Sequence, residues 1–307
     1  MENKKIDDID FEQIKKNFSD FKHIFENGDK EKACDMLKEL LDSLEDGLTV
    51  RKAGKIQNDL SIVCGENDGV NYDENNGGRE AAGNNEIYIS LNHVMEYYIF
   101  QYYFKPQANI CCSEIPFAHY YRTYGDFCMT IGKYHAANKA YKKAIEWNPV
   151  DLDAILGLAE TYKYLEKMKK YLELTKTAHR YCCTRATMAR YYRNMGFYYV
   201  SLYMTELARA CYIYSNIYYH TDNADNELKY LETALNDKTP DYDIRTMQAM
   251  FDKEGIEPGP ESDTVGIIYQ VGKIMLNEGE KQLAKDCLSI VYDITQEEEI
   301  EKILNSL

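Results

Sequence analysis

The sequence predicts an all-α fold built from stacked pairs of antiparallel helices. The main observation is a pattern of small residues, a turn glycine and a closing proline at helical spacing within residues 118–151. Weaker copies of this pattern follow at 152–185, 189–222 and 265–298. A single helix pair of this kind cannot bury its own apolar face, so neighbouring pairs must stack on it. We therefore expect an extended array of helix pairs.

In the clearest repeat, the first helix is expected from about residue 115 to 131 and the second from about 134 to 147. Gly125 and Ala137 are small where the two helices should cross, which allows their backbones to approach closely. Gly132 suits the end of the first helix, because glycine tolerates the left-handed C-cap conformation best. The second helix should end before proline 149, since a residue that precedes proline disfavours the helical conformation.

The spacing of these residues resembles the 34-residue tetratricopeptide repeat. The residues that carry the resemblance are Gly125, Gly132, Tyr134, Ala137, Tyr141, Ala144 and Pro149. The resemblance implies a right-handed superhelical solenoid that holds a protein or peptide partner on its concave face. It covers about two-thirds of the chain, and residues 223–264 fit only as a degenerate repeat that ends at a Gly/Pro-rich break.

The sequence predicts three regions along the chain. Residues 1–64 form an N-terminal helical hairpin region, with two helices joined at Asn27-Gly28-Asp29. Residues 65–85 are rich in glycine and asparagine, and a segment so poor in apolar residues is expected to be a flexible loop. Residues 86–307 form the helical solenoid, and within them 90–105 read as a buried helix with Ser90 as its N-cap. The short stretch 86–89 before this helix is either extended or part of a loop.

Composition indicates a folded protein that does not bind nucleic acid. The net charge is −15, with 36 basic and 51 acidic residues, and such a field repels phosphate backbones. The nine cysteines include no CxxC pair, which favours reduced thiols packed between helices. The N-terminus is polar and charged, and no long apolar run occurs, so we expect a cytoplasmic protein without a membrane span.

Catalytic and metal-binding motifs are missing from the sequence. It contains no GxSxG, Walker, HExxH or strand-linked GxGxxG pattern, and its six histidines lack ligand spacing. Residues 73–84 resemble a calcium loop only faintly, because Asn84 stands where a bidentate glutamate is needed. We therefore expect no enzyme activity, no cofactor and no metal site.

The resemblance places the partner on the first helix of each repeat. Tyr164 and Tyr191 are added because tyrosine supplies contact area at low entropic cost and these two lie off the packing positions. The other explanation for any of the 28 tyrosines is that it fills a large-residue position of the repeat. The candidate residues are His119, Arg122, Asp126, Met129, Lys163, Tyr164, Arg190, Tyr191, Arg193, Asn194 and Phe197.

Arg190, Arg193 and Asn194 form a basic and amide cluster that could hold an acidic peptide or a C-terminal carboxylate. The alternative is that the arginines pair within the chain, for example with Asp153 or Glu160. The lysine and asparagine clamp of chaperone-binding relatives is broken, because Asp126 stands where that clamp needs asparagine. Chaperone tails are therefore not the expected partner.

These observations predict a non-catalytic protein-interaction module. Aromatic and arginine residues would provide affinity, and the acidic surroundings would favour basic partners. One alternative is a self-associating structural protein, a homo-oligomer whose groove is filled by its own N-terminal segment or by another copy. A second alternative is a peptide-sensing regulator, for which Asn194 is the one matching asparagine.

Overall fold

The computed structural model describes residues 11–48 and 86–307. Over these residues the chain forms 14 helices in sequential antiparallel pairs, so the predicted helical repeat fold is confirmed. Two short strands add to it. The chain divides into two compact units, Met1–Lys167 (unit 1) and Met168–Leu307 (unit 2). The predicted loop at 65–85 and parts of the predicted N-terminal region lie outside the described residues.

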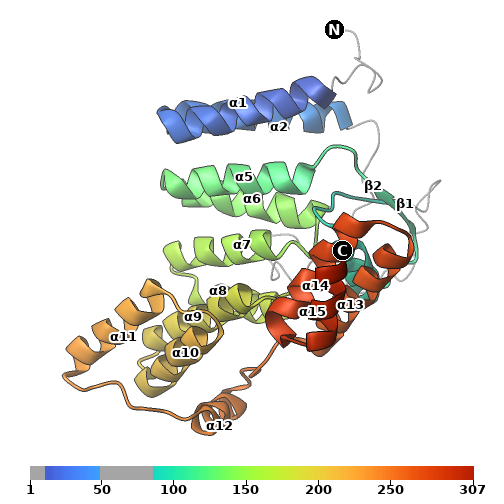
Figure 1. The fold of residues 1–307 in the computed structure, drawn as a ribbon. Coiled ribbons are helices and arrows are strands. Elements are labelled where there is room, and N and C mark those ends of the chain that lie inside the picture. Colours follow the sequence, from blue (N-terminus) through green and yellow to red (C-terminus); the bar gives the residue numbers. More distant parts are fainter. Residues whose placement is uncertain (1–10, 49–85) are drawn as a thin grey trace, which may run out of the picture. The chain divides into compact units, whose positions relative to one another are not determined.

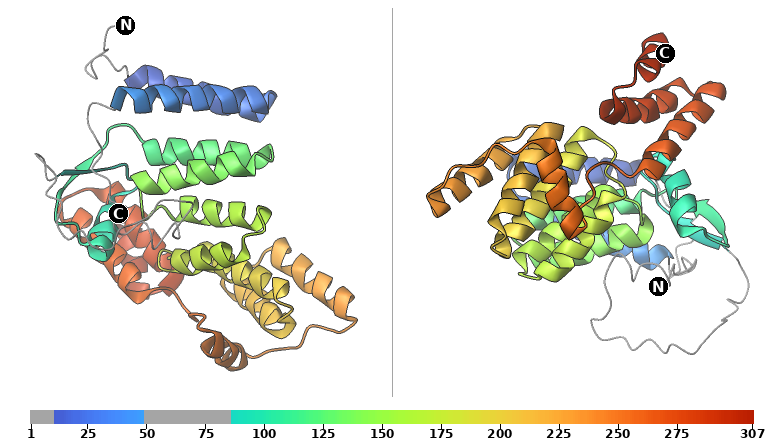
Figure 2. Two further views of the ribbon diagram at one scale, coloured as in Figure 1. Left: turned by 180° about the vertical axis from the view of Figure 1, so that it is seen from behind. Right: turned by 90° about the horizontal axis from the view of Figure 1, so that it is seen from below.

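Unit 1 consists of stacked helix layers with a small β-α-β segment at one side. Figures 1 and 2 show α1–α2, α5–α6 and α7 as successive layers. The helix pair predicted around Asn27-Gly28-Asp29 is present, as are the two helices of the clearest repeat. The elements are α1 (Phe11–Asn27), α2 (Lys30–Leu48), β1 (Glu86–Ile89), α4 (Val94–Phe104), β2 (Asn109–Cys112), α5 (Phe117–Thr130), α6 (Tyr134–Trp147) and α7 (Leu152–Tyr164).

Aromatic stacking joins the first helix pair to the second. The rings of Phe25 and Phe127 lie 3.8 Å apart between centroids and are nearly parallel, and Phe18 stacks on Tyr120 at 4.2 Å. Aromatic side chains bury large apolar areas, so these two contacts stabilise the packing of the first pair on the second. The α1–α2 pair therefore continues the layers of unit 1.

The crossing of α5, α6 and α7 depends on one tyrosine held between two glycines. A Cβ atom at Gly125 would lie 2.8 Å from the Tyr141 ring, and one at Gly157 would lie 2.5 Å from it. The ring cannot move aside easily, because it is 2% exposed and its hydroxyl donates to Asp126 at 2.6 Å. Gly132 ends α5 with a φ of 74°, as the sequence predicted.

The β-α-β segment settles one open point of the sequence prediction and corrects another. The stretch 86–89 is extended and pairs in parallel with β2, with Ile87 opposite Ile110, and β2 itself was not predicted. A parallel pair needs a crossover, which α4 provides. Ser90 does not cap α4, whose N-cap is His93. The Ser90 hydroxyl instead accepts from the Ala118 amide at 3.3 Å, so it binds the start of α5.

Unit 2 contains the remaining helices. The segment expected to be a degenerate repeat forms α11 and α12. The elements are α8 (Met168–His179), α9 (Arg185–Ser201), α10 (Thr205–Tyr218), α11 (Asp222–Leu235), α12 (Ile244–Glu254), α13 (Ser262–Asn277), α14 (Lys281–Thr295) and α15 (Glu298–Ser306). The side chain of Arg209 on α10 is fully buried and donates to Asp237 at 3.0 Å, which fixes the connection that follows α11.

The link between α12 and α13 is held by its backbone carbonyls. Tyr192 donates to the carbonyl of Glu257 at 2.7 Å, and Tyr214 and Tyr218 donate to that of Pro258 at 2.9 and 3.3 Å. These donors come from α9 and α10. Because they bind the main chain, the position at which α13 begins is fixed without a regular secondary structure in the link.

The α13–α14 hairpin repeats the register of α5–α6. Gly272 stands where Gly125 stands, and a Cβ there would lie 2.9 Å from Leu288, the counterpart of Tyr141. The turn glycines also match, since Gly279 has a φ of 84°. The weak repeat predicted at 265–298 is therefore a helix pair of the same construction.

We predict that Gly125→Ala destabilises the protein by about 1–3 kcal/mol, because the added methyl group overpacks the pinned Tyr141 ring. The matched control is Gly266→Ala on α13, where nothing lies within 4 Å of the added Cβ. That change should stabilise by roughly 0.5–1 kcal/mol through helix propensity alone. Urea denaturation followed by circular dichroism measures both. Equal effects at the two positions would contradict the role assigned to the Gly125–Tyr141 contact.

Candidate partner-binding surfaces

Arg122 on α5 is held by carboxylates at the start of α7. Its guanidinium lies 3.0 Å from Asp151 and 3.4 Å from Asp153. Burial disfavours the charged form of Arg122, but the two carboxylates outweigh burial and raise its pKa. Arg122 also lies 3.2 Å from His119, whose pKa is lowered by burial and by that guanidinium. A charge already neutralised in this way contributes little attraction for a partner.

Asp151 joins three elements of unit 1. It is 1% exposed, and its side chain accepts from the Ala154 amide at 3.0 Å, which caps α7. It also accepts from the side chain of Asn92, just before α4, at 2.9 Å. The sequence did not predict Asp151 as a partner of Arg122. The available signal was an aspartate two positions after Pro149, which is typical of a helix N-cap.

A second carboxylate, Glu96, lies buried beside this cluster. It accepts hydrogen bonds from the amides of Asn92 and His93 at 2.6 and 3.1 Å, and from the side chain of Asn148 at 2.9 Å. Burial raises the pKa of Glu96, and the neighbouring Asp151 raises it further, against the effect of these three donors. The cluster of Arg122, Asp151 and Glu96 is therefore a buried polar network that joins α4, α5 and α7.

The other unit 1 candidates differ in accessibility. Asp126 is exposed and accepts from Tyr141, while Met129 is half-buried. Lys163 lies 3.2 Å from Glu160 on its own helix. Tyr164 is 50% exposed and stacks on Tyr134 at 4.4 Å. Tyr164 therefore presents one open aromatic face at the end of α7.

In unit 2, Arg190 and Arg193 lie together on α9 and are both half-buried. Arg193 donates to the Ser215 hydroxyl at 3.3 Å. Neither arginine forms an ion pair with another described residue of its unit. Burial lowers the pKa of Arg193, and the charge of Arg190 lowers it further. The two acids that the sequence offered as internal partners, Asp153 and Glu160, pair with Arg122 and Lys163 in unit 1.

The remaining α9 candidates are tied to their surroundings to different degrees. The main-chain carbonyl of Asn194 accepts from Tyr171 at 3.2 Å, and the Phe197 ring meets Tyr171 edge-on at 5.7 Å. Tyr191 is 1% exposed and contacts the rings of His179 and Tyr192. Its side chain packs in the interior of unit 2 and is not accessible to a partner.

Three further features of the described residues bear on metal binding, membrane insertion and disulfide formation. Residues 11–48 and 86–307 contain no cluster of three His, Cys, Asp or Glu side chains that could hold a metal ion. None of the helices within the same ranges is both long and apolar enough to cross a membrane. Every cysteine in this part of the chain is a free thiol.

Comparison with known proteins identifies the repeat. Residues 118–151 match the family described as "Tetratricopeptide repeat". No curated protein matches the chain. Among solved structures, the chain is similar to YrrB, described as "a TPR protein with an unusual peptide-binding site", with 14% identity and a TM-score of 0.31. That similarity covers 69% of this chain and 98% of YrrB. At this TM-score it does not bear on where a site lies.

We predict that Glu96→Gln makes the protein more stable and that the gain grows with pH. A carboxyl whose folded-state pKa is raised stabilises the fold below its ordinary pKa, and this contribution is lost as pH rises through the folded value. The melting temperature of the wild type should therefore fall relative to Glu96→Gln between about pH 5 and about pH 8. Glutamine keeps the oxygen that accepts the three hydrogen bonds and removes the buried charge.

Glu114→Gln is the matched control for this prediction, because Glu114 is exposed. Its melting temperature should follow that of the wild type at every pH. A difference between Glu96→Gln and the wild type that does not change with pH would contradict the assignment of a raised pKa to Glu96.

Proposed function

We propose that this tetratricopeptide repeat protein is a non-catalytic interaction module that binds a protein or peptide partner. The repeat at 118–151 supports the coarse assignment, because tetratricopeptide modules generally bind proteins or peptides. The proposed contact residues are the accessible candidates on the first helices of the repeats. In unit 2 these are Arg190, Arg193, Asn194 and Phe197, and in unit 1 they centre on Met129, Lys163 and Tyr164.

The observation that carries the proposal is the arginine pair on α9. Two like charges side by side repel, and their partial burial removes some of the water that would solvate them. The chain has a net charge of −15, and Arg122 and Arg209 each pair with acids of their own unit. Arg190 and Arg193 have none within their unit. A carboxylate from a partner would relieve the repulsion and accept bidentate hydrogen bonds.

The neighbours of the arginine pair fit a peptide better than an isolated anion. Phe197 lies one turn further along α9 and is half-buried, so it offers apolar contact area beside the charged pair. The Asn194 side chain adds both a donor and an acceptor for a peptide backbone. The proposed ligand is therefore an acidic side chain or chain terminus followed by an apolar residue.

We predict that Arg190→Glu/Arg193→Glu abolishes capture of the partner. The measurement is a crosslinked pull-down from the native host's lysate, with the wild type and the variant as bait. Charge reversal places two carboxylates where the partner's carboxylate would bind, and like charges in contact cost several kcal/mol, roughly. A protein captured by the wild type and lost from the variant is the expected result.

The matched control is Lys176→Glu/Lys229→Glu, which makes the same change in net charge at exposed positions of α8 and α11. It should capture the partner as the wild type does. Equal capture by all three baits would refute the arginine site. Recovery of the bait alone would favour the self-associating alternative. Far-UV circular dichroism checks that helix content is unchanged.

A further inference from the structure

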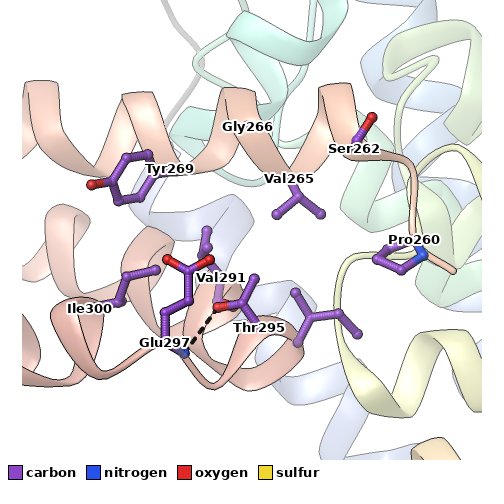
Figure 3. A pocket seen from close by; sticks show the side chains of 10 residues that line it. Pro260, Ser262, Val265, Gly266, Tyr269, Val291, Thr295, Glu297 and Ile300 are labelled. Carbon is purple, nitrogen blue, oxygen red and sulfur yellow. Dashed lines mark hydrogen bonds between the residues drawn. The ribbon is translucent and has the colours of Figure 1, made fainter.

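Unit 2 contains a cavity of about 470 Å³ between α13, α14 and α15. One face of α13 forms its upper wall in Figure 3, through Ser262, Val265, Gly266 and Tyr269. They share a face because Ser262 and Gly266, and Val265 and Tyr269, are each four residues apart. The opposite wall is apolar, with Val291, Ile294 and Ile300 from the end of α14 and from α15. The size falls within the usual range of ligand sites.

The equivalent place in unit 1 is covered. When Gly272 is aligned with Gly125, the cavity residues Val265, Ile294 and Thr295 correspond to Ala118, Trp147 and Asn148 of α5–α6. The Ala118 amide donates to the Ser90 hydroxyl, the Ser90 amide donates to the Trp147 carbonyl, and the Asn148 side chain donates to Glu96 in the first turn of α4. Helix α4 thus begins on top of this junction.

Unit 2 repeats the junction but lacks this cover among its own described residues. The hairpin has the same register, the same glycine contact and the same turn glycine. The wall residues that correspond to Ala118 and Trp147 are the apolar Val265 and Ile294, which line the cavity. Ala118 and Asn148 are buried in unit 1, whereas their counterparts Val265 and Thr295 in unit 2 are half-buried and exposed, respectively.

Acidic residues predominate among the residues that line the cavity and their neighbours in sequence. Figure 3 shows the Glu297 carboxylate pointing from the start of α15 toward α13. Residues 260–269 and 291–301, which contain all the lining residues, include no lysine or arginine. They carry the carboxylates of Glu261 and Glu297–Glu299, while the Asp293 carboxylate accepts from the Arg185 amide at 2.7 Å. An apolar floor with a rim of one sign favours an occupant of the opposite sign.

We propose that the α13–α15 cavity binds a basic amphipathic helix of a partner protein. Its apolar side chains would enter between α13 and α14, and its lysine or arginine residues would pair with Glu297 and the neighbouring carboxylates. A helix is the expected form because a helix can present apolar side chains on one face and basic side chains on the other. None of the residues in the arginine site on α9 is involved, so this inference stands apart from the proposed function.

The test uses the full-length protein and a fluorescein-labelled peptide of roughly 18 residues, long enough to form a helix. Its leucines are spaced at i, i+3, i+4 and i+7, and lysines occupy the other face. A peptide with glutamate in place of lysine is the control ligand. Fluorescence anisotropy should show at least about tenfold tighter binding of the Leu/Lys peptide.

Two variants separate the cavity from general attraction to an acidic protein. Gly266→Leu fills the cavity without changing charge, and a Cβ at Gly266 meets nothing within 4 Å. It should weaken binding of the Leu/Lys peptide by about tenfold or more. Glu297→Lys reverses the rim charge at a residue whose side chain makes no cap bond to α15, and should weaken binding similarly. Circular dichroism and the melting temperature check that both variants fold.

Asp252→Lys is the matched control, since it makes the same charge change at an exposed position on α12. It should bind the Leu/Lys peptide as the wild type does. The proposal is overturned if Gly266→Leu binds like the wild type, if Asp252→Lys weakens binding as much as Glu297→Lys, or if no saturable binding occurs up to about 1 mM peptide. A concentration-dependent mass in sedimentation that Gly266→Leu abolishes would overturn it in favour of a second copy.

Discussion

The packing of a large side chain against a glycine, found at four glycines of the described chain, is the contact on which the repeated helix crossings depend. In unit 1, Tyr141 lies against both Gly125 on α5 and Gly157 on α7. One side chain thereby sets the separation of two successive layers. The Arg122–Asp151 pair follows from it, because Arg122 precedes Gly125 by one turn and Asp151 begins the helix that carries Gly157.

The same contact recurs in unit 2 with different chemistry. Tyr212 lies 2.9 Å from the Cβ that an alanine at position 196 would add, and Leu288 has the same relation to Gly272. An aliphatic side chain can thus replace the aromatic ring, provided that the opposite residue has no side chain. The contact depends on volume, since interiors are close-packed and the crossing leaves room for one large residue only.

The sequence predicted those parts of the fold that local chemistry determines. The helices of residues 118–151 end where Gly132 and Pro149 require, and the glycine at 125 lies at the crossing. The prediction for Ser90 was wrong because a serine before an apolar helix caps that helix only if its hydroxyl has no other hydrogen-bond partner. Here the amide of Ala118, 28 residues away, takes the hydroxyl. Strand β2 was missed because its four residues pair with a distant segment and carry no pattern of their own.

The sequence predicted which helices carry the candidate residues but not their contacts, because the position of a charged residue on a helix does not determine which side chains of the neighbouring helix lie next to it. Arg122 and Arg193 occupy comparable places on α5 and α9. Asp151 neutralises Arg122 because α7 begins with an aspartate cap directly opposite, whereas Arg193 meets the hydroxyl of Ser215. The difference arises from the neighbouring helix. Tyr191 shows the same dependence, since its burial follows from the aromatic residues of α8 and α9 around it.

The comparison of the α5–α6 and α13–α14 hairpins extends this reasoning to recognition. Their shared register fixes the crossing glycine, the turn glycine and the shape of the junction that follows. What lies over that junction in unit 1 is Ser90–Glu96, a segment outside the 34-residue pattern. A search for repeat residues therefore cannot reveal whether a junction is covered or open. The repeat residues determine how a helix pair packs, whereas segments outside the repeat determine whether its junction is buried. A surface open to a partner is therefore expected where a helix pair repeats without a segment such as Ser90–Glu96.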